Sequence, residues 1–493
     1  MSQKEKTQVS KTMFIHIAIG IILMFAGWFV PPFATVTELG MKILFIFIGV
    51  IYLWSTVETT WSSCLAVILV GMSGYTAKIG DTITSGFGNT TVVLVLFSMI
   101  LFGGLIESGV AKYIARFFLT RKISNGRPYV FTFIFTIGLF VVSLLTNVFA
   151  TLMLAWPIAY AILNEVGYTK EDKFAKFFVF CAFLGSIFGQ ITIPFRGSKI
   201  AIFKGFENAF GSGIDFMMFM VFDAFMAVVL TLILLFLCKF VYKCDVSKMK
   251  NFNVSYFDND PLPKMNNTQK YYLAVCFLYI LCMLLPNVLD ATIPVVAFLN
   301  KVGTTGITMA WVIISCIIHF DGKPALDFKQ VSAKHVQWNV IMLVVVAIMM
   351  SSALTSEGTG IKPLIMSVLT PILGGHSMWM TGCLMMLVGF ILTNVANNFV
   401  CAMVMLPLFG TFAAETAMDP ATAAAIACAS IVCLYMAFLT PAASPYAGML
   451  HSNTEWFTPA ELYKFAVPFS LLLIAAFFFI GYPVAIFLFG LVA

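Results

Sequence analysis

The sequence predicts an all-α integral membrane protein with about eleven transmembrane helices and two re-entrant hairpins, arranged as an inverted repeat. Hydrophobic residues make up 61% of the 493 residues and charged residues only 10%, whereas soluble domains carry about 25% charge. The Lys and Arg residues behind the net charge of +6 gather in loops between long apolar stretches. The tetrapeptide Leu-Thr-Asn-Val occurs twice, at 145–148 and 392–395, inside two such stretches. The charge pattern predicts membrane topology and gives no indication of nucleic-acid binding.

The chain begins with a basic segment and an apolar stretch from Met13 to Val30. This stretch is long enough to span, and no small-residue cleavage site follows it, so we expect a retained helix with a cytoplasmic N-terminus. The first four spans are expected near residues 12–31, 41–57, 61–76 and 90–109. The next segment is strongly basic and is predicted to be a cytoplasmic loop, with Lys112, Arg116, Arg121, Lys122 and Arg127.

Residues 128–164 form one apolar block whose two flanks are both basic. Both flanks are therefore expected in the cytoplasm, so the block leaves and returns on the same side as a hairpin with Thr146-Asn147 near its tip. At roughly 36 residues, such a block could equally form two thin full crossings, with its ends on the same side. A span near 174–210 and another near 215–240 follow. The polar segment 241–270 is the predicted linker between the two halves.

The second half is predicted to repeat this layout with the membrane sides exchanged. Residues 360–376 and 413–420 carry little positive charge and are expected outside, so block 377–412 forms a hairpin entered from that side. The other predicted spans lie near 271–287, 303–320, 338–356, 421–450 and 463–490. The C-terminus is then external, in a multi-pass protein of a plasma membrane, here the bacterial inner membrane.

The two hairpin tips are the first candidate site, because asparagine is costly at membrane depth unless it has a partner or lines a cavity. Helix N-termini at such a tip attract an anion, whereas loop carbonyls and Asn or Thr oxygens suit Na⁺. The alternative is that these Asn and Thr residues only join helices by hydrogen bonds.

A break rich in Gly, Pro, Thr and Ser follows each hairpin, at 185–198 and 439–445. Such residues interrupt a span and free backbone carbonyls, although a simple proline kink is the alternative. Arg196 lies beside the first break, where it could bind a substrate carboxylate, act as a fixed charge in place of a cation, or pair with Asp223. Glu107, at a predicted cytoplasmic helix end, is expected to pair with Lys112 or Arg116.

Other classes of protein find little support in the sequence. The eleven Cys are scattered without a C-x-x-C pair, the five His are dispersed, and no Walker, Rossmann, H-E-x-x-H or G-x-S-x-G motif occurs. We therefore expect no enzyme activity, no catalytic residues and no cofactor. A Na⁺/H⁺ antiporter remains an alternative and would need a buried carboxylate, for which Asp223 is the candidate.

Taken together, these motifs resemble the divalent anion–sodium symporter family of the ion transporter superfamily. That family carries a Ser-Asn-Thr motif at each hairpin tip, followed by an apolar run ending in Pro. Thr146-Asn147-Val148 before Pro157 is similar to the first motif. The second has two possible registers, Thr393-Asn394-Val395 or Asn397-Asn398-Phe399 before Pro407, and Thr440-Pro441 resembles a family helix break.

The resemblance implies a homodimer in which hairpins and broken helices move across the membrane as an elevator, carrying di- or tricarboxylates with Na⁺ as coupling ion. A Na⁺-independent anion exchanger using Arg196 as fixed charge is the alternative. The implied regions are scaffold helices at 1–127 and 271–356, transport domain at 128–240 and 357–493, and linker 241–270. The implied substrate-binding residues are Thr146, Asn147, Val148, Thr393, Asn394, Asn397, Asn398, Arg196, Thr440 and Pro441. The Na⁺ candidates are Thr146, Asn147, Gly189, Thr393, Asn394, Asn398 and Ala443.

Overall fold

The computed structural model describes residues 11–259 and 262–492, and within them the chain is nearly all helical. Among the described residues, eleven helices are long and apolar enough to cross a membrane, and the predicted class of an all-α membrane protein is confirmed. Strand within these residues is confined to a small antiparallel pair, β1 (His319–Phe320) and β2 (Lys323–Pro324). The eleven include both helices of each hairpin, so each hairpin helix approaches the length of a full crossing.

Two stretches of the chain repeat the same series of elements: a long helix, a short helix, a helical hairpin, a broken helix and a final long helix. The first series is α5 (Thr90–Ser108), α6 (Ala111–Leu119), η1 (Lys122–Ser124), α7 (Pro128–Leu145), α8 (Val148–Glu165), α9 (Lys173–Phe188), η2 (Gly197–Lys199), α10 (Ile200–Phe210), α11 (Phe216–Phe236) and η3 (Leu237–Val241). The second is α15 (Trp338–Thr355), η6 (Glu357–Thr359), α16 (Ile361–Leu373), α17 (Met378–Val395), α18 (Asn398–Glu415), α19 (Pro420–Leu434), α20 (Pro445–Ser452), α21 (Pro459–Ala476), η7 (Phe477–Gly481) and α22 (Tyr482–Phe489). Both final helices contain a π-helical turn: η3 closes the helix that begins with α11, whereas η7 joins α21 to α22 within one continuous helix.

The remaining helices flank these two series. Four precede the first series: α1 (Lys11–Ala26), α2 (Glu38–Thr56), α3 (Thr60–Ser73) and α4 (Ile79–Phe87). Between the series lie η4 (Lys248–Asn251), η5 (Val254–Asn259), α12 (Asn267–Val288), α13 (Pro294–Ile317) and α14 (Phe328–His335). The segment predicted as a linker thus contains two 3₁₀ turns, and its Val254 N–H donates to the side chain of Asn125, before the first hairpin.

Two predicted loops are helices. The basic segment after α5 forms α6, and the segment expected outside before the second hairpin forms α16. Both helices are too short to span a bilayer and occupy the same place in the two series. Loop charge and hydropathy locate membrane spans, but they do not detect a short helix beside a span. For this reason both segments were predicted as loops.

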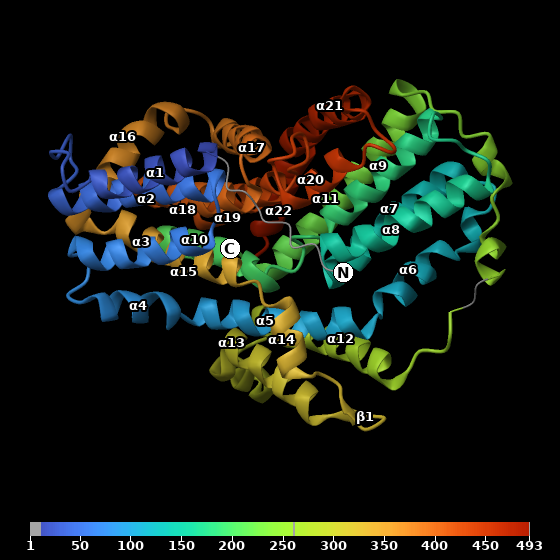
Figure 1. The fold of residues 1–493 in the computed structure, drawn as a ribbon, viewed down its shortest axis with the longest axis horizontal. Helices are drawn as coiled ribbons and strands as arrows, with labels where there is room; N and C mark the ends of the chain where they lie inside the picture. The colour runs from blue at the N-terminus through green and yellow to red at the C-terminus, as the bar shows by residue number, and fades with distance from the viewer. Residues whose placement is uncertain (1–10, 260–261, 493) are drawn as a thin grey trace.

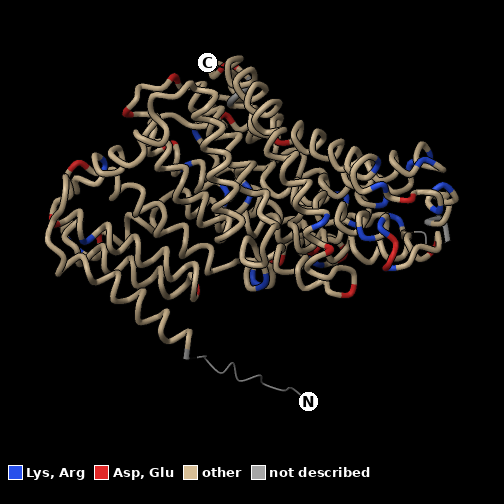
Figure 2. The backbone as a smooth tube through the Cα atoms, turned by 90° about the horizontal axis from the view of Figure 1, so that it is seen from above, with Lys and Arg blue, Asp and Glu red and all other residues tan. Residues whose placement is uncertain are grey.

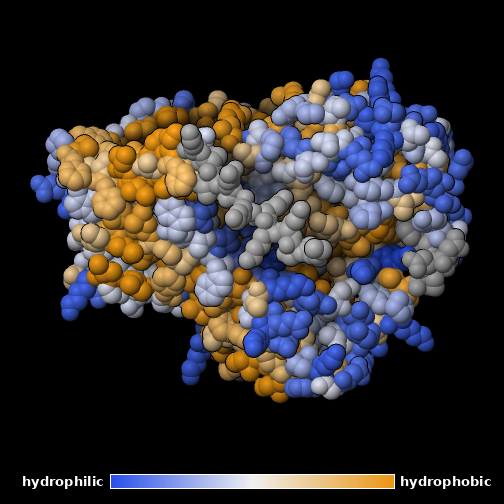
Figure 3. Space-filling model, in the orientation of Figure 1, coloured by the Kyte–Doolittle hydropathy of each residue, from blue (hydrophilic) through white to orange (hydrophobic). Residues whose placement is uncertain are grey.

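The two halves of the sequence are interleaved in space. Figure 1 shows the blue helices α2 and α3 beside the orange helix α15, with α2 also beside α18, and the green helix α9 beside the red helix α21. In Figure 2, Lys and Arg gather at one end of the elongated chain, as expected if that end faces the cytoplasm. Apolar side chains cover much of the left side of the face in Figure 3. Phe29, in the loop after α1, is 84% exposed and suited to lipid contact.

The core is built around the first pieces of the two broken helices. Every residue of α9 from Phe174 to Phe188 is buried, as is every residue of α19 from Ala423 to Leu434. Aromatic rings fill the space around α9, with Phe135 and Phe178 stacked at 4.6 Å between centroids. Because α9 and α19 both end abruptly inside this core, their breaks bring backbone polar groups to the centre of an apolar protein.

Candidate functional site

We name the contact between the α7–α8 tip (145–148) and the break after α9 (189–199) the first junction. A charged side chain from the break stabilises this contact. Helix α7 ends at Leu145, and the guanidinium of Arg196 donates to the carbonyls of Ser143, at 2.9 Å, and Leu144. The last carbonyls of a helix lack intrahelical donors, so a cation is favourable there. Both bonds use Nη1, and among the described residues no hydrogen bond involves Nη2 or Nε. Arg196 is only 7% exposed.

The tip of the first hairpin is built by Asn147. Its extended backbone ends α7 and starts α8, and its Oδ1 accepts a hydrogen bond from the Ala150 N–H at 2.8 Å. Thr146 donates to the Val142 carbonyl at 2.7 Å, so its hydroxyl hydrogen is used within the hairpin. These contacts explain why a Thr-Asn pair is found at a helix-to-helix turn.

The second junction is the contact of the α17–α18 tip (395–398) with the break after α19 (435–444). Asn397 starts α18, and its Oδ1 accepts from the N–H groups of Phe399 and Val400 at 3.0 and 3.3 Å. The side chain of Asn398 donates to the hydroxyl of Tyr446. Asn397 therefore occupies the place in the second hairpin that Asn147 has in the first. In the second hairpin the Leu-Thr-Asn-Val sequence lies about one helical turn before the tip.

Asn394 joins the second junction through neutral hydrogen bonds. Its Oδ1 accepts from the N–H groups of Phe438, at 2.9 Å, and Leu439, at 2.8 Å. Its Nδ2 donates to the carbonyls of Phe390 and Met436 at 2.8 and 3.3 Å. With both oxygen lone pairs occupied, the Asn394 side chain is saturated and is 4% exposed.

The two junctions meet at a cavity of about 380 Å³. Six of the predicted site residues line it, namely Thr146, Asn147, Val148, Arg196, Asn397 and Asn398. Six others, namely Gly189, Thr393, Asn394, Thr440, Pro441 and Ala443, are absent from the lining. Thr393 donates to the Leu434 carbonyl at 2.6 Å and Thr440 to the Asn394 carbonyl at 2.7 Å, so their hydroxyls serve the second junction.

Basic side chains predominate over acidic ones in the lining of the cavity. Its lining includes Arg196, Lys199, Lys334 and His335 and contains no Asp or Glu among the described residues. Five helices also begin at the cavity: α8, α10, α15, α18 and α20 each contribute a residue of their first turn or N-cap. Helix N-termini carry a partial positive charge and free N–H groups, so they add to the attraction for an anion.

The helix C-termini near the cavity have backbone carbonyls that already accept hydrogen bonds from side chains. Arg196 binds the end of α7, and Gln190 donates to the Tyr435 carbonyl at 2.9 Å. Asn394 and Thr393 take the carbonyls of Met436 and Leu434. The helix N-termini, which are partly positive, line the cavity, whereas the partly negative C-terminal carbonyls are bonded to side chains. This arrangement favours an anion over a cation at the centre of the cavity.

Two acidic residues lie near this cavity. Asp223 of α11 is buried, and its Oδ2 accepts from the Thr192 hydroxyl at 2.5 Å; no ion pair to Arg196 is formed. Glu107 forms ion pairs with Lys334 at 2.6 Å and His335 at 2.8 Å, partners from α14 that differ from the predicted Lys112 and Arg116. Proximity in sequence suggested the wrong partners, because α14 packs against α5 only in the folded chain.

Sequence reasoning did not assign Gln190, Lys199, Lys334, His335 or Tyr446 to the site. Gln190 lies within the first break, and Tyr446 lies two residues after the second. Their position in or beside a break was the available indication of a role in the site. Lys334 and His335 precede a span by a few residues, where a basic pair normally reports topology.

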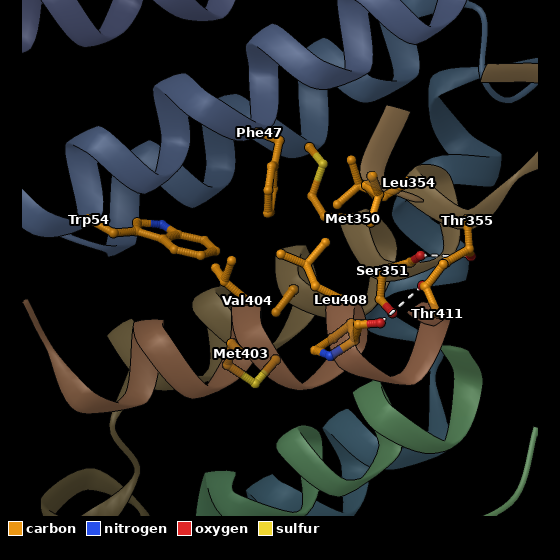
Figure 4. A pocket seen from close by; sticks show the side chains of 13 residues that line it. Phe47, Trp54, Met350, Ser351, Leu354, Thr355, Met403, Val404, Leu408 and Thr411 are labelled. Carbon is orange, nitrogen blue, oxygen red and sulfur yellow. Dashed lines mark hydrogen bonds between the residues drawn. The ribbon is translucent and has the colours of Figure 1, made fainter. Parts of the chain in front are cut away.

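A second, much smaller cavity of about 20 Å³ separates the second hairpin from α2 and α15. Figure 4 shows Phe47 and Trp54 of α2 and Met350 of α15 facing Val404 and Leu408 of α18. The Ser351 hydroxyl is buried there and has no hydrogen-bond partner among the described residues, although Thr355 donates to the Ser351 carbonyl at 2.9 Å. This contact between α18 and the N-terminal helices is therefore apolar and imperfectly filled.

The two repeated series of elements, the spans and the central cavity define a multi-pass membrane transporter. Residues 43–433 match the family model described as "Citrate transporter", and the chain belongs to this family. The fold is similar to the crystal structure of the Alcanivorax borkumensis YdaH transporter, with a TM-score of 0.57 and 12% sequence identity over 83% of this chain and 86% of that one. No curated protein matches the sequence. The superfamily suggested by the hairpin motifs is thereby confirmed.

Proposed function

We propose that the protein is a secondary active transporter of di- or tricarboxylates such as citrate and succinate. The observation that carries this proposal is the cavity between the two junctions, with four basic side chains, five helix N-termini and no carboxylate in its lining. An Arg with a free donor edge suits a carboxylate, which accepts two parallel hydrogen bonds from a guanidinium. Membership of the citrate transporter family supports the same class of substrate.

Transport is proposed to follow an elevator mechanism, coupled to Na⁺, within a homodimer. The imperfectly packed apolar contact between α18 and the helices α2 and α15 supports movement of the second hairpin along that surface, because few hydrogen bonds would break. Among the described residues, Oδ1 of Asn398 accepts no hydrogen bond, and a side-chain oxygen of this kind at a hairpin tip suits Na⁺. Because Arg196 already supplies a buried positive charge, anion exchange without Na⁺ is the second candidate, and Na⁺/H⁺ exchange through Asp223 is the third.

The experiment is uptake of radiolabelled citrate and succinate into proteoliposomes, with an inward Na⁺ gradient, with internal unlabelled dicarboxylate, or with neither. Uptake driven by Na⁺ supports symport, whereas uptake that needs only internal dicarboxylate establishes exchange. Asn147→Ala and Arg196→Gln are each expected to lower uptake at least about tenfold through loss of a ligand-facing polar group, as a charged hydrogen bond contributes about 1.5–3 kcal/mol. Lys204→Gln, on α10 but bonded to Glu207, is the matched control. Carboxylate movement under none of these conditions would overturn the proposal.

A further inference from the structure

Lys199 is the cavity residue whose charge is least compensated. It ends the 3₁₀ turn η2, starts α10 and lines the cavity three residues after Arg196. Among the described residues its ammonium has no hydrogen bond and no ion pair, and the charged groups that influence it are Arg196, which repels it, and Asp223, which attracts it. By contrast, the buried Lys176 pairs with Glu461 at 2.5 Å.

Asp223 only partly compensates these two cations. Its Oδ2 is hydrogen-bonded to Thr192, and it forms no ion pair with either Arg196 or Lys199. This part of the cavity therefore contains two basic side chains and one acidic side chain, and the N-termini of α8 and α10 add further positive potential. An uncompensated cation inside a membrane protein is costly unless water or a ligand reaches it, and here the cavity provides that access.

Arg196 and Lys199 differ in what they can bind. Arg196 is fixed by its bonds to Ser143 and Leu144 and offers the remaining guanidinium edge. Lys199 has a flexible stem and a point charge with three donors, none of them used within the described protein. Two cations on one short segment, one fixed and one adaptable, suit a ligand with two carboxylates better than a ligand with one.

We propose that Lys199 is a specificity-determining residue that binds a carboxylate of the substrate other than the one bound by Arg196, so that the site selects polycarboxylates over monocarboxylates. This inference rests on the proposed function and deepens it. It assigns the discrimination to a single side chain of the first junction, with no equivalent cation in the second break, residues 435–444.

The test uses three anions with the same propane backbone: butyrate with one carboxylate, glutarate with two and tricarballylate with three. Binding is measured by titration calorimetry on purified full-length protein in detergent, for wild type, Lys199→Gln and Lys199→Arg, with Lys204→Gln as control. For wild type we expect glutarate and tricarballylate to bind at least about tenfold tighter than butyrate. Lys199→Gln should weaken both by about 10- to 100-fold and butyrate by less than about threefold.

Lys199→Arg should retain most of the discrimination, because it keeps the charge. An equal loss for all three anions in Lys199→Gln, or no loss for any, would overturn the inference while leaving carboxylate binding by the wild type intact. Failure of the wild type to bind any of the three would overturn the proposed function itself. Size-exclusion profiles and melting temperatures are recorded for every variant, and Lys199→Met replaces Lys199→Gln if the latter does not fold.

Discussion

At the first junction a guanidinium from the break binds the end of the hairpin, whereas at the second an amide from the hairpin binds the backbone of the break. Arg196 reaches Ser143 and Leu144 of α7, and Asn394 of α17 reaches Phe438, Leu439 and Met436. Both arrangements satisfy backbone groups that a broken helix leaves without partners. Only the first introduces charge, so the two-fold layout of the fold becomes electrostatically asymmetric at its centre.

This comparison teaches that a repeat in sequence and a repeat in structure need not coincide. The two Leu-Thr-Asn-Val copies place Asn147 at a tip and Asn394 one turn before a tip. The residue at the second tip is Asn397, outside the repeated tetrapeptide. We therefore expect Asn394 to affect stability, and Asn147 and Asn397 to affect both stability and transport.

The largest effect is expected from Asn394→Ala. The substitution removes four hydrogen bonds and leaves the buried N–H group of Phe438 and the half-buried N–H group of Leu439 without an acceptor. With about 1–3 kcal/mol for each unsatisfied buried group, the free energy of unfolding should fall by about 2–5 kcal/mol. Denaturant unfolding in detergent measures this, and a loss below about 1 kcal/mol would remove the basis for treating the second junction as a stabilising contact.

The next effect concerns the two tips. Asn147→Ala and Asn397→Ala should each lower the free energy of unfolding by about 1 kcal/mol, the usual contribution of an N-cap side chain. Asn266→Ala, which removes the N-cap of α12 away from the cavity, should cost a similar amount. Citrate uptake should fall in the two tip variants and stay unchanged in Asn266→Ala. Equal uptake in all three would show that the tips act only as caps.

A smaller effect is expected from Glu107→Gln. Glu107 compensates Lys334 and His335, whereas Lys199 is not compensated by an ion pair. Releasing Lys334 and His335 should strengthen the attraction for an anion, so that the KM for citrate falls by about two- to fivefold at low salt, in the range of a partly exposed ion pair. The measurement is the KM at low and high ionic strength, and a rise in KM would indicate that the ion pairs position α14.

The smallest effect lies at the bases of the two hairpins. Hydrogen bonds from the Thr169 N–H and from Lys248 hold the pKa of Asp172 below its ordinary value of 3.8, whereas Asp419, at the corresponding place, bonds to Thr422. A carboxyl group whose pKa is lowered in the folded protein stabilises the fold at pH values above its ordinary pKa. This contribution disappears as the pH falls through the lowered pKa. Asp172→Asn should therefore cost less than about 1 kcal/mol at pH 7, and the difference from wild type should shrink as the pH falls below 3.8 and through the lowered pKa. A difference that persists at low pH would contradict this origin.

Much of the architecture could be predicted from particular segments. The breaks at 189–199 and 435–444 follow from Gly, Pro and Ser in apolar stretches, because these residues interrupt a helix wherever it is placed. The helices α6 and α16 were missed, because neither spans a membrane and because Lys112 and Arg116 of α6 were interpreted as the charge of a loop. Glu107 was assigned to neighbours in sequence, whereas its partners come from more than two hundred residues later.

By itself, the sequence determined that this chain is a multi-pass helical membrane protein with two hairpins and two broken helices, because hydropathy, loop charge and helix-breaking residues act locally along the chain. It also marked Arg196 and the two asparagine-rich tips as candidates. Only the tertiary structure decided which asparagine stands at the second tip, which carbonyls Arg196 binds and which cations share one cavity. These depend on the register between elements far apart in the chain, and hydrogen bonds such as those of Asn394 form only once that register is fixed.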